Sequence, residues 1–344
     1  MIDVLNRVLM PNVCRYASQQ NKPERITTMK VRNVCILGGS GFVGHYLAEA
    51  LTERGLEIRI LTRQPARARD LLVLPSTEVE QADVHDSAQL IHQFSGMDAV
   101  INLVGVLHDG RDNGSFYGAH VDLADKVVDA CAQAGVRRLV HMSALKADPQ
   151  GPSAYLRSKG KGEETVREGA LKQGIAATIF RPSIIFGPGD RFLNRFAQLI
   201  RLSPVIPLAC PNARFQPVFV EDVARAFAES LDDRGSFGQT YDLCGPQTYT
   251  LKQLVSLVAT LTGRTRTIIG LGPSLSRIQA RVLEWLPGQP MTRDNLLSLQ
   301  VDNVCACAFP RDFTPTALEA IAPLYLAGTS SRGRYAYFRY TAGR

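Results

Sequence analysis

The stretch Val34-Cys-Ile-Leu-Gly-Gly-Ser-Gly-Phe-Val-Gly44 decides the fold of this chain. An apolar strand runs into glycines at positions 38, 41 and 44, and a helical pattern begins directly behind them. The first glycine permits a tight turn, the second leaves room for a pyrophosphate at a helix N-terminus, and the third lets helix and strand pack closely. The spacing predicts a phosphate-binding turn. Its expected contacts are Gly38, Ser40, Gly41, Phe42, Val43 and Gly44.

The residues around this turn place it in a repeating pattern. Short apolar or β-branched runs alternate with amphipathic segments of helical length, which is typical of βαβ units. We therefore predict an α/β fold with a Rossmann-type, doubly wound parallel sheet. This context favours a nucleotide site over a glycine turn of purely structural origin. The expected strands are 34–37, 57–62, 78–81, 99–104, 138–143 and 177–181, and the expected helices include 43–54, 87–94, 122–134, 154–173 and 192–201.

The alternation weakens after Pro182, where Gly and Pro become frequent. We expect a smaller C-terminal lobe that interleaves with the sheet domain. The predicted division has four parts. Residues 1–30 form a disordered extension, and 31–245 form a Rossmann domain whose segment 184–214 contributes to the small lobe. Residues 246–328 form a substrate or partner lobe, and 329–344 form a flexible basic tail. Residues 1–28 are basic but lack an apolar core segment, which makes them a poor secretory signal. A mitochondrial location is expected only if they form a presequence.

Composition excludes several classes of protein. A chain of 344 residues with 45% hydrophobic and 21% charged content is neither disordered nor fibrous. Its longest charge-free stretch, 33–48, is shorter than a membrane span. The net charge of +7 suits an anionic ligand, nucleic acid or a membrane surface without choosing among them. Seven scattered cysteines without a Cys-x-x-Cys pair favour free thiols, no metal and a reducing compartment, so a cytoplasmic location is expected.

The end of the second expected strand bears on the choice of dinucleotide. An Asp or Glu there would bind the adenosine ribose of NAD(H), but this strand ends in Thr62 and Arg63. Arg63 and Arg67 could pair with a 2′-phosphate, so the sequence favours NADP(H), with NAD(H) as the alternative. Further expected cofactor contacts follow later strands, at Asp83, Val84, Leu103, Val104 and Gly105.

Several later motifs complete a family resemblance. Tyr155-Leu-Arg-Ser-Lys159, Arg181-Pro-Ser183, Phe186-Gly-Pro-Gly189 and Pro217-Val-Phe-Val-Glu-Asp-Val223 follow the glycine loop in order. With them the chain resembles the extended or atypical short-chain dehydrogenase/reductases, related to NAD-dependent epimerases and dehydratases. It is most similar to the subgroup of the nucleotide-binding accessory subunit of mitochondrial respiratory complex I and its bacterial relatives. The resemblance covers about 31–326 and adds Arg181, Pro182 and Ser183 to the expected cofactor contacts.

The resemblance also implies a chemistry. In active members of the family the tyrosine exchanges a proton with a substrate oxygen while the cofactor carries a hydride, which assigns these roles to Tyr155 and, as its electrostatic support, Lys159. The two residues share a helix face because they are four apart. A lysine ammonium about 4 Å away should lower the pKa of the tyrosine towards neutrality. Ser143 is the expected third group, although Ala144 occupies one of the two positions where the family hydroxyl could fall.

Two functions therefore compete at the level of sequence. Tyr155 and Lys159 favour an oxidoreductase or epimerase/dehydratase-type enzyme for an unknown small molecule, related to complex I or to ubiquinone metabolism. Ala144 and the basic charge favour a non-catalytic nucleotide-binding component of a membrane respiratory complex. Nucleic-acid binding rests only on the basic, aromatic C-terminus and is set aside.

One segment bears on membrane association. In 274–286 the side chains of Leu275, Ile278, Val282, Trp285 and Leu286 fall on one helical face, opposite Arg277 and Arg281. An amphipathic helix that closes the small lobe with this face is the first expectation. A helix lying at a membrane surface is the second.

Overall fold

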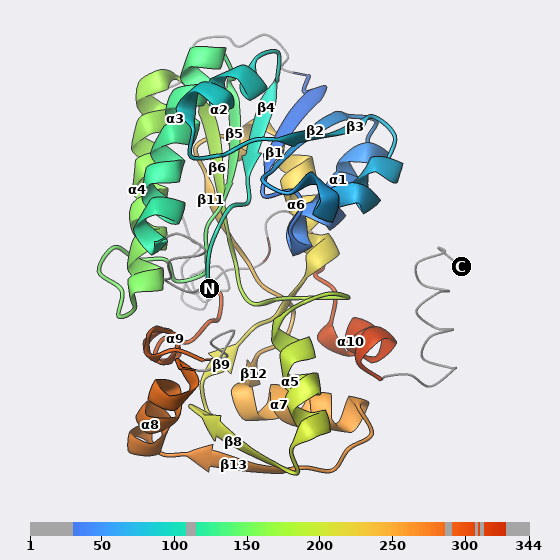
Figure 1. The fold of residues 1–344 in the computed structure, drawn as a ribbon, viewed down its shortest axis with the longest axis vertical. Coiled ribbons are helices and arrows are strands. Elements are labelled where there is room, and N and C mark those ends of the chain that lie inside the picture. Colours follow the sequence, from blue (N-terminus) through green and yellow to red (C-terminus); the bar gives the residue numbers. More distant parts are fainter. Residues whose placement is uncertain (1–29, 108–114, 286–290, 307–308, 310–312, 328–344) are drawn as a thin grey trace, which may run out of the picture.

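The computed structural model describes residues 30–107, 115–285, 291–306, 309 and 313–327. Its centre is a sheet of seven parallel strands in the order β11-β6-β5-β4-β1-β2-β3 (Figure 1). This confirms the predicted fold class. The strands are β1 (Asn33–Leu37), β2 (Glu57–Thr62), β3 (Thr77–Gln81), β4 (Ala99–Asn102), β5 (Arg138–Met142), β6 (Ala176–Pro182) and β11 (Thr240–Leu243).

Helices cover both faces of this sheet. On one face α1 (Phe42–Glu53) packs against α6 (Val220–Ser230), and on the other α2 (Ser87–Phe94), α3 (Leu123–Ala134) and α4 (Ala154–Gln173) lie side by side (Figure 1). Alternate residues of β1 enter the two apolar clusters that result: Val34 and Ile36 join one, Cys35 and Leu37 the other. Burial on both faces explains why this strand is a continuous apolar run.

The observed elements follow the sequence expectation closely in the sheet domain. The bounds expected for 57–62, 87–94 and 154–173 are those of β2, α2 and α4, and the other expected elements shift by one or two residues. The fourth strand ends at Asn102 rather than at 104, because the Asn102 side chain accepts the Val104 N–H at 3.0 Å. Strand β11 was not predicted, since it is short and lies far along the chain from its partner β6.

The small lobe lies across the carboxyl edge of the sheet. It interleaves with the sheet domain, because α5 (Phe192–Leu202) and α7 (Leu251–Leu261) pack together although the strand β11 lies between them in sequence (Figure 1). Its C-terminal part is tied to buried carboxylates: Asp190 accepts the Tyr325 hydroxyl at 2.7 Å, and Asp222 accepts the Thr316 N–H at 2.6 Å. The lobe contains α5 (Phe192–Leu202), β8 (Val205–Ala209), α7 (Leu251–Leu261), β13 (Thr267–Leu271), α8 (Pro273–Leu283), α9 (Arg293–Ser298) and α10 (Leu318–Leu326).

Helix α8 corrects one expectation. Its apolar face does not close the lobe, since Ile278 and Val282 are exposed to 60% and 59%. The helix instead packs through Ser276 and Ala280, which are buried, against β8 and α9. Small side chains on that face allow the close approach, and the larger apolar side chains point outwards as a result.

The cysteines supply a second correction. Cys244, just after β11, forms a disulfide with Cys305, where free thiols were expected. The two residues are 61 apart in sequence, and only the tertiary fold brings them together. The Cys305 N–H bonds the Gln216 side chain at 3.0 Å, which holds this segment beside the sheet. Cys35 and Cys131 are buried free thiols, and burial raises the pKa of Cys35 to about 12.

Some expectations fall outside the described residues. These are the disordered N-terminal extension, apart from residue 30, and the basic tail at 329–344. The domain boundaries stay predictions. Within the described ranges, no helix has both the length and the apolar character needed to cross a bilayer. Nor do three or more His, Cys, Asp or Glu side chains gather there into a metal site.

The packing of α1 on β1 gives a stability prediction. A Cβ on Gly44 would lie 2.2 Å from the Gly39 carbonyl oxygen, whereas a Cβ on Gly41 would meet only the Gly38 carbonyl oxygen, at 3.1 Å. We expect Gly44→Ala to lower the free energy of unfolding by about 2–3 kcal/mol, because backbone must move, and Gly41→Ala to cost clearly less. Urea unfolding of both variants measures this, and equal losses would contradict it.

Candidate functional site

The glycine loop forms one wall of the candidate site. Gly38 has a φ of +76°, which the turn after β1 requires, and Gly41 is the N-cap of α1. Gly41 has no side chain to cap the helix, so within the described residues the first N–H groups of α1 have no side-chain acceptor. Free N–H groups and the positive end of the helix dipole suit a phosphate. The loop therefore fits the pyrophosphate of a dinucleotide.

The end of β2 lies beside this loop. The Ser40 hydroxyl donates to the Thr62 hydroxyl at 3.2 Å, and Thr62 also accepts the Gln64 N–H. Arg63 is therefore next to a residue that touches the loop, and its side chain is exposed. The backbone of Arg67 lies in the helical segment η2 (Pro65–Val73), but its side chain falls outside the described part of the structure.

A cleft of about 2080 Å³ separates the sheet edge from the small lobe. Its upper wall comes from the glycine loop and the ends of β4, β5 and β6, while its lobe wall is largely apolar, with Phe192, Phe196, Leu199, Ile206 and Phe215. The cleft brings together most of the predicted site residues. These are Gly38, Ser40, Gly41, Phe42, Val43, Gly44, Leu103, Gly105, Ser143, Tyr155, Lys159, Pro182 and Ser183.

Other predicted site residues do not line this cleft. Asp83 and Val84 lie in the loop after β3, where the Asp83 carboxylate accepts the His85 N–H at 3.0 Å. Val104 and Arg63 are also absent from the lining. The guanidinium of Arg181 is engaged by the buried carboxylate of Glu163, at 2.8 Å from Nε to Oε1.

Tyr155 and Lys159 occupy the first turns of α4 and face the cleft. Burial lowers the pKa of Lys159 to about 8, while the Glu163 carboxylate one turn further along raises it. The Lys159 ammonium donates to the Met142 carbonyl at 3.2 Å. Burial raises the pKa of Tyr155 to about 12, where the sequence argument expected it to fall. Desolvation of the phenol is the one cause of this shift, so in the protein alone the Lys159 ammonium does not lower the pKa of Tyr155.

The predicted third group, Ser143, follows β5 directly. Its hydroxyl oxygen is buried and has no hydrogen-bond partner among the described residues, and the same is true of the His141 Nδ1. Ala144 also lines the cleft, so this wall offers one hydroxyl rather than two. A buried polar atom without a partner is costly and calls for an explanation. Because Ser143 lines the cleft, its hydroxyl is available to a ligand there.

His120 is a site residue that the sequence argument missed. It lies in the π-helical segment η3 (Gly118–Asp122), and its Nε2 accepts the Val106 N–H at 3.1 Å, which leaves the ring proton on Nδ1. Nδ1 donates to the Ser158 hydroxyl at 2.8 Å, and Ser158 donates to the Tyr155 carbonyl at 2.9 Å. Burial, with a contribution from Lys159, lowers the pKa of His120 to about 2, so the ring is neutral. His120 therefore joins the loop after β4 to the tyrosine helix.

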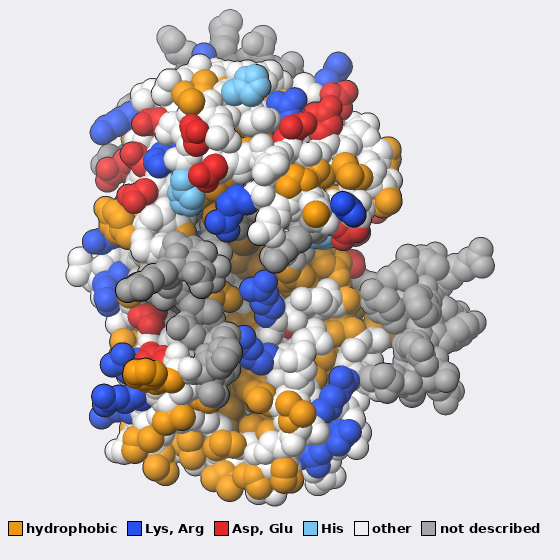
Figure 2. All heavy atoms as spheres, in the orientation of Figure 1, with side chains coloured by type: hydrophobic (Ala, Val, Ile, Leu, Met, Phe, Trp, Pro, Cys, Tyr) orange, Lys and Arg blue, Asp and Glu red, His pale blue; other side chains and the backbone are white. Residues whose placement is uncertain are grey.

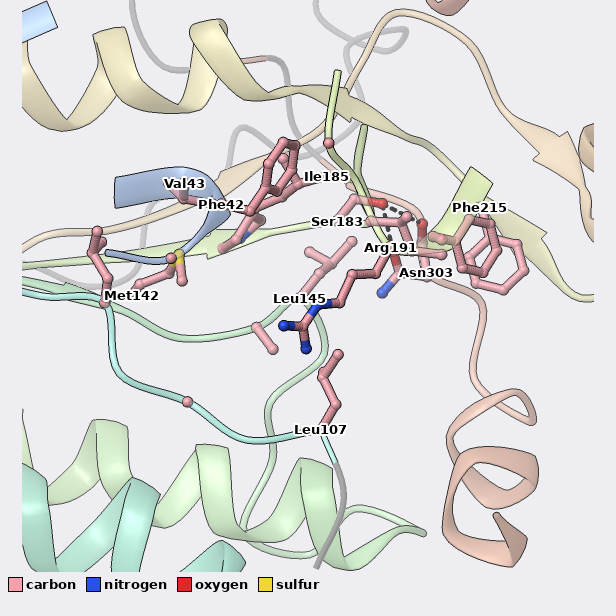
Figure 3. A pocket seen from close by; sticks show the side chains of 18 of the residues that line it. Phe42, Val43, Leu107, Met142, Leu145, Ser183, Ile185, Arg191, Phe215 and Asn303 are labelled. Atoms are coloured by element: carbon pink, nitrogen blue, oxygen red, sulfur yellow. Dashed lines mark hydrogen bonds between the residues drawn. The ribbon is translucent and has the colours of Figure 1, made fainter. Parts of the chain in front are cut away.

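Three further residues come from distant parts of the chain. Asp294 on α9 accepts the Ala154 and Tyr155 N–H groups, at 2.6 and 3.1 Å, and so caps α4 from the small lobe. Asn303 accepts the Ser183 hydroxyl, and Figure 3 shows Arg191 extending into the cleft near Leu107 and Leu145. No spacing rule in the sequence links Asp294 or Asn303 to the tyrosine helix.

Comparison with known proteins agrees with this geometry. The profile of the NAD dependent epimerase/dehydratase family matches residues 34–244, which is more than half of the chain. The chain belongs to this family. UDP-glucuronic acid 4-epimerase from Bacillus cereus, solved with UDP-glucuronic acid and NAD, shares the fold with a TM-score of 0.62. The sequence identity is 16%, over 79% of this chain and 95% of that one.

Two curated relatives are closer in sequence. One is the mitochondrial NADH dehydrogenase (ubiquinone) 1 alpha subcomplex subunit 9 of Arabidopsis thaliana, 32% identical over 65% of this chain and 56% of the relative. The other is the ceramide reductase of Caulobacter vibrioides, 33% identical over 56% of this chain and 58% of the relative. The matches thus span little more than half the length of either relative. They confirm the resemblance to the complex I subunit that the sequence indicated.

The buried ammonium leads to a pH-dependent prediction. Because the pKa of Lys159 falls from 10.5 to about 8 on folding, its charge destabilises the native state below pH 8 by about 3 kcal/mol. We expect Lys159→Met to raise the melting temperature of the nucleotide-free protein at pH 7. The gain should shrink between about pH 8 and 10.5, where the native protein loses the proton and the unfolded chain keeps it.

Thermal unfolding at pH 7 and pH 10 measures this difference. The control is Lys161→Met, because Lys161 lies on the same helix and is exposed. A lower melting temperature for Lys159→Met at pH 7 would show instead that the contacts with Met142 and Glu163 outweigh the burial of the charge.

Proposed function

We propose that the protein is an NADP(H)-dependent oxidoreductase that reduces a carbonyl group to an alcohol. The observation that carries this proposal is that Tyr155 and Lys159 line the same cleft as the glycine loop. A reduced nicotinamide dinucleotide would supply the hydride. The glycine loop and the uncapped N-terminus of α1 would hold its pyrophosphate, and Lys159 its nicotinamide ribose.

The state of Tyr155 supports the direction of the reaction. With a pKa near 12 the phenol keeps its proton at neutral pH, so it is ready to act as an acid. The substrate oxygen takes this proton as the carbonyl carbon becomes bonded to hydrogen. The Lys159 ammonium then stabilises the phenolate, which regains a proton from solvent. Ser143, whose buried hydroxyl has no partner among the described residues, offers the substrate oxygen a second hydrogen bond.

The preference for NADP(H) rests on the end of β2. No Asp or Glu occurs from Ile60 to Arg69, whereas Arg63 is exposed beside the loop contact made by Thr62. A guanidinium pairs with a phosphate through strong, charge-assisted hydrogen bonds. This arrangement supports recognition of a 2′-phosphate, although the solved relative from Bacillus cereus holds NAD.

A second candidate function is a non-catalytic, nucleotide-binding component of a membrane respiratory complex. It is favoured by Ala144, which leaves Ser143 as the one hydroxyl directly after β5, and by the relative from Arabidopsis thaliana, which bears the name of a complex I subunit. In that role the protein would attach to the inner membrane rather than act free in the cytoplasm.

The cofactor preference can be measured by fluorescence titration. We expect NADPH to bind more tightly than NADH, and Arg63→Ala to weaken NADPH roughly ten-fold while leaving NADH unchanged, because only NADPH carries the 2′-phosphate. Arg69→Ala is the matched control, an exposed arginine further along the same segment. Equal affinities of the unmodified protein for both nucleotides would rule out the preference.

The proposed chemistry is tested with Tyr155→Phe, which removes only the hydroxyl. Consumption of NADPH with a panel of aldehydes, ketones and quinones should fall by about 10²–10⁴ in this variant, with nucleotide affinity unchanged. Tyr117→Phe, at a tyrosine that is 53% exposed, should keep full activity. If NADPH raises the melting temperature but no carbonyl compound is turned over, the non-catalytic role becomes the better account.

A further inference from the structure

Helix α8 presents an apolar surface to solvent. Leu275, Ile278, Val282 and Trp285 are exposed to 56%, 60%, 59% and 86%. The spacing of the first three places them on one side of the helix, and Trp285 follows two residues after its end. This side points away from Ser276 and Ala280, through which the helix packs on the lobe. Four large apolar side chains held in water on one short element are unusual for a helix whose other side is already buried.

Neighbouring elements extend the same surface. Leu202 at the end of α5 is 83% exposed, and Val205 on β8 and Ile269 on β13 are 39% and 48% exposed. Strands β8 and β13 pair with each other, and α8 packs on β8 through a hydrogen bond from Gln279 to the Pro207 carbonyl. Figure 2 shows hydrophobic side chains along this lower edge of the molecule. We call this surface the lobe face; it consists of Leu202, Val205, Ile269, Leu275, Ile278, Val282 and Trp285.

The apolar exposure is concentrated rather than scattered. Of the fourteen large hydrophobic side chains that are exposed in the described ranges, eight lie on α5, β8, β13 and α8 or directly after α8. The others are spread over the sheet domain, the loops and α9. A single exposed leucine needs no explanation, but a contiguous apolar patch marks an interaction surface.

The charge around the lobe face is mainly positive. The segments 192–220 and 246–283, which contain α5, β8, α7, β13 and α8, hold eight Lys and Arg and no Asp or Glu. The acid next to this surface, Glu284 before Trp285, is paired with Arg293 at 2.9 Å. This local excess is as large as the net charge of +7 of the whole chain. Arg277 and Arg281 on α8 are both exposed and flank the apolar side of the helix. A partner surface that fits this pattern has negative charges at its outer layer, for the arginines, and an apolar layer under them, for the apolar side chains.

We propose that the lobe face docks on an anionic phospholipid bilayer, with α8 lying in the plane of the interface. Its apolar side chains enter the boundary between headgroups and acyl chains, and the flanking arginines pair with lipid phosphates. Trp285 is suited to the headgroup level, where tryptophan is enriched. A protein partner or a second copy of this chain would need acidic residues to match, and the acid in the segments that form the lobe face, Glu284, is already paired with Arg293.

Docking in this way would bring the cleft close to the bilayer. Gln279 and Leu283 of α8 and Leu199 of α5 line the cleft, so the elements that form the lobe face also form its lobe wall. That wall is apolar, as described above. A ligand with an apolar chain could therefore pass between bilayer and cleft with little exposure of that chain to water.

The chain carries its own probe for this proposal, because Trp285 is its single tryptophan. The full chain is mixed with vesicles of phosphatidylcholine, alone or with phosphatidylglycerol. We expect a blue shift of tryptophan emission and co-sedimentation with the mixed vesicles, and at least roughly ten-fold weaker binding to phosphatidylcholine alone or at high salt. Emission that is unchanged by either kind of vesicle would overturn the proposal.

Two variants separate the apolar and the charged contributions. Ile278→Asp with Val282→Asp, and separately Arg277→Gln with Arg281→Gln, should each weaken binding to the mixed vesicles roughly ten-fold or more. The matched controls are Leu171→Asp, at a residue on α4 that is 82% exposed, and Arg137→Gln, at an exposed arginine in the sheet domain. All these side chains are solvent-exposed, and an unchanged melting temperature shows that each variant has folded.

Two further results would overturn the proposal. One is binding to vesicles that is equal in the lobe-face variants and in the controls, which would place the membrane contact elsewhere. The other is a blue-shifted Trp285 without vesicles, together with a dimer on size-exclusion chromatography that the Ile278→Asp, Val282→Asp variant abolishes. That outcome would place a second copy of the chain on this face.

Discussion

A contact between the two walls of the cleft holds the tyrosine helix in place. The carboxylate of Asp294 accepts the first two N–H groups of the tyrosine helix, across 139 residues of sequence or more. A negative charge at a helix N-terminus is favourable, so this contact stabilises α4 and joins it to the small lobe. The same helix carries Tyr155 and Lys159 towards the cleft and Glu163 towards Arg181. The small lobe thus fixes the position of Tyr155, the proposed proton donor, as well as closing the cleft around it.

The sheet domain was largely predictable because its signals are local. A glycine loop, an apolar strand and an amphipathic helix can each be recognised within about a dozen residues. The bounds of β2, α2 and α4 were predicted correctly from such local patterns. What the sequence did not show depends on contacts between distant segments. His120, Asp294 and the pairing of Cys244 with Cys305 have no spacing rule, and β11 is too short to be recognised without its neighbour β6.

Helix α8 shows a different limit of prediction from sequence. Its periodicity correctly predicted that the large apolar residues share one side, but periodicity does not say which side faces the protein. That choice was made by Ser276 and Ala280, whose small side chains let the helix approach β8 closely. The pKa shift of Tyr155 could not be predicted from the sequence for a similar reason. Whether the pKa rises or falls depends on how deeply the phenol is buried, and this burial arises only when the cleft is assembled.

The interleaving of the sheet domain and the small lobe limits how such a protein can evolve. The chain leaves the sheet after β6 to form α5 and β8, returns for α6 and β11, and leaves again for α7 and the rest of the lobe. No single cut would release the lobe, so it cannot be exchanged as a module by one recombination event. A new ligand preference in this chain has to arise by substitutions along the existing wall, with the nucleotide half of the cleft left in place.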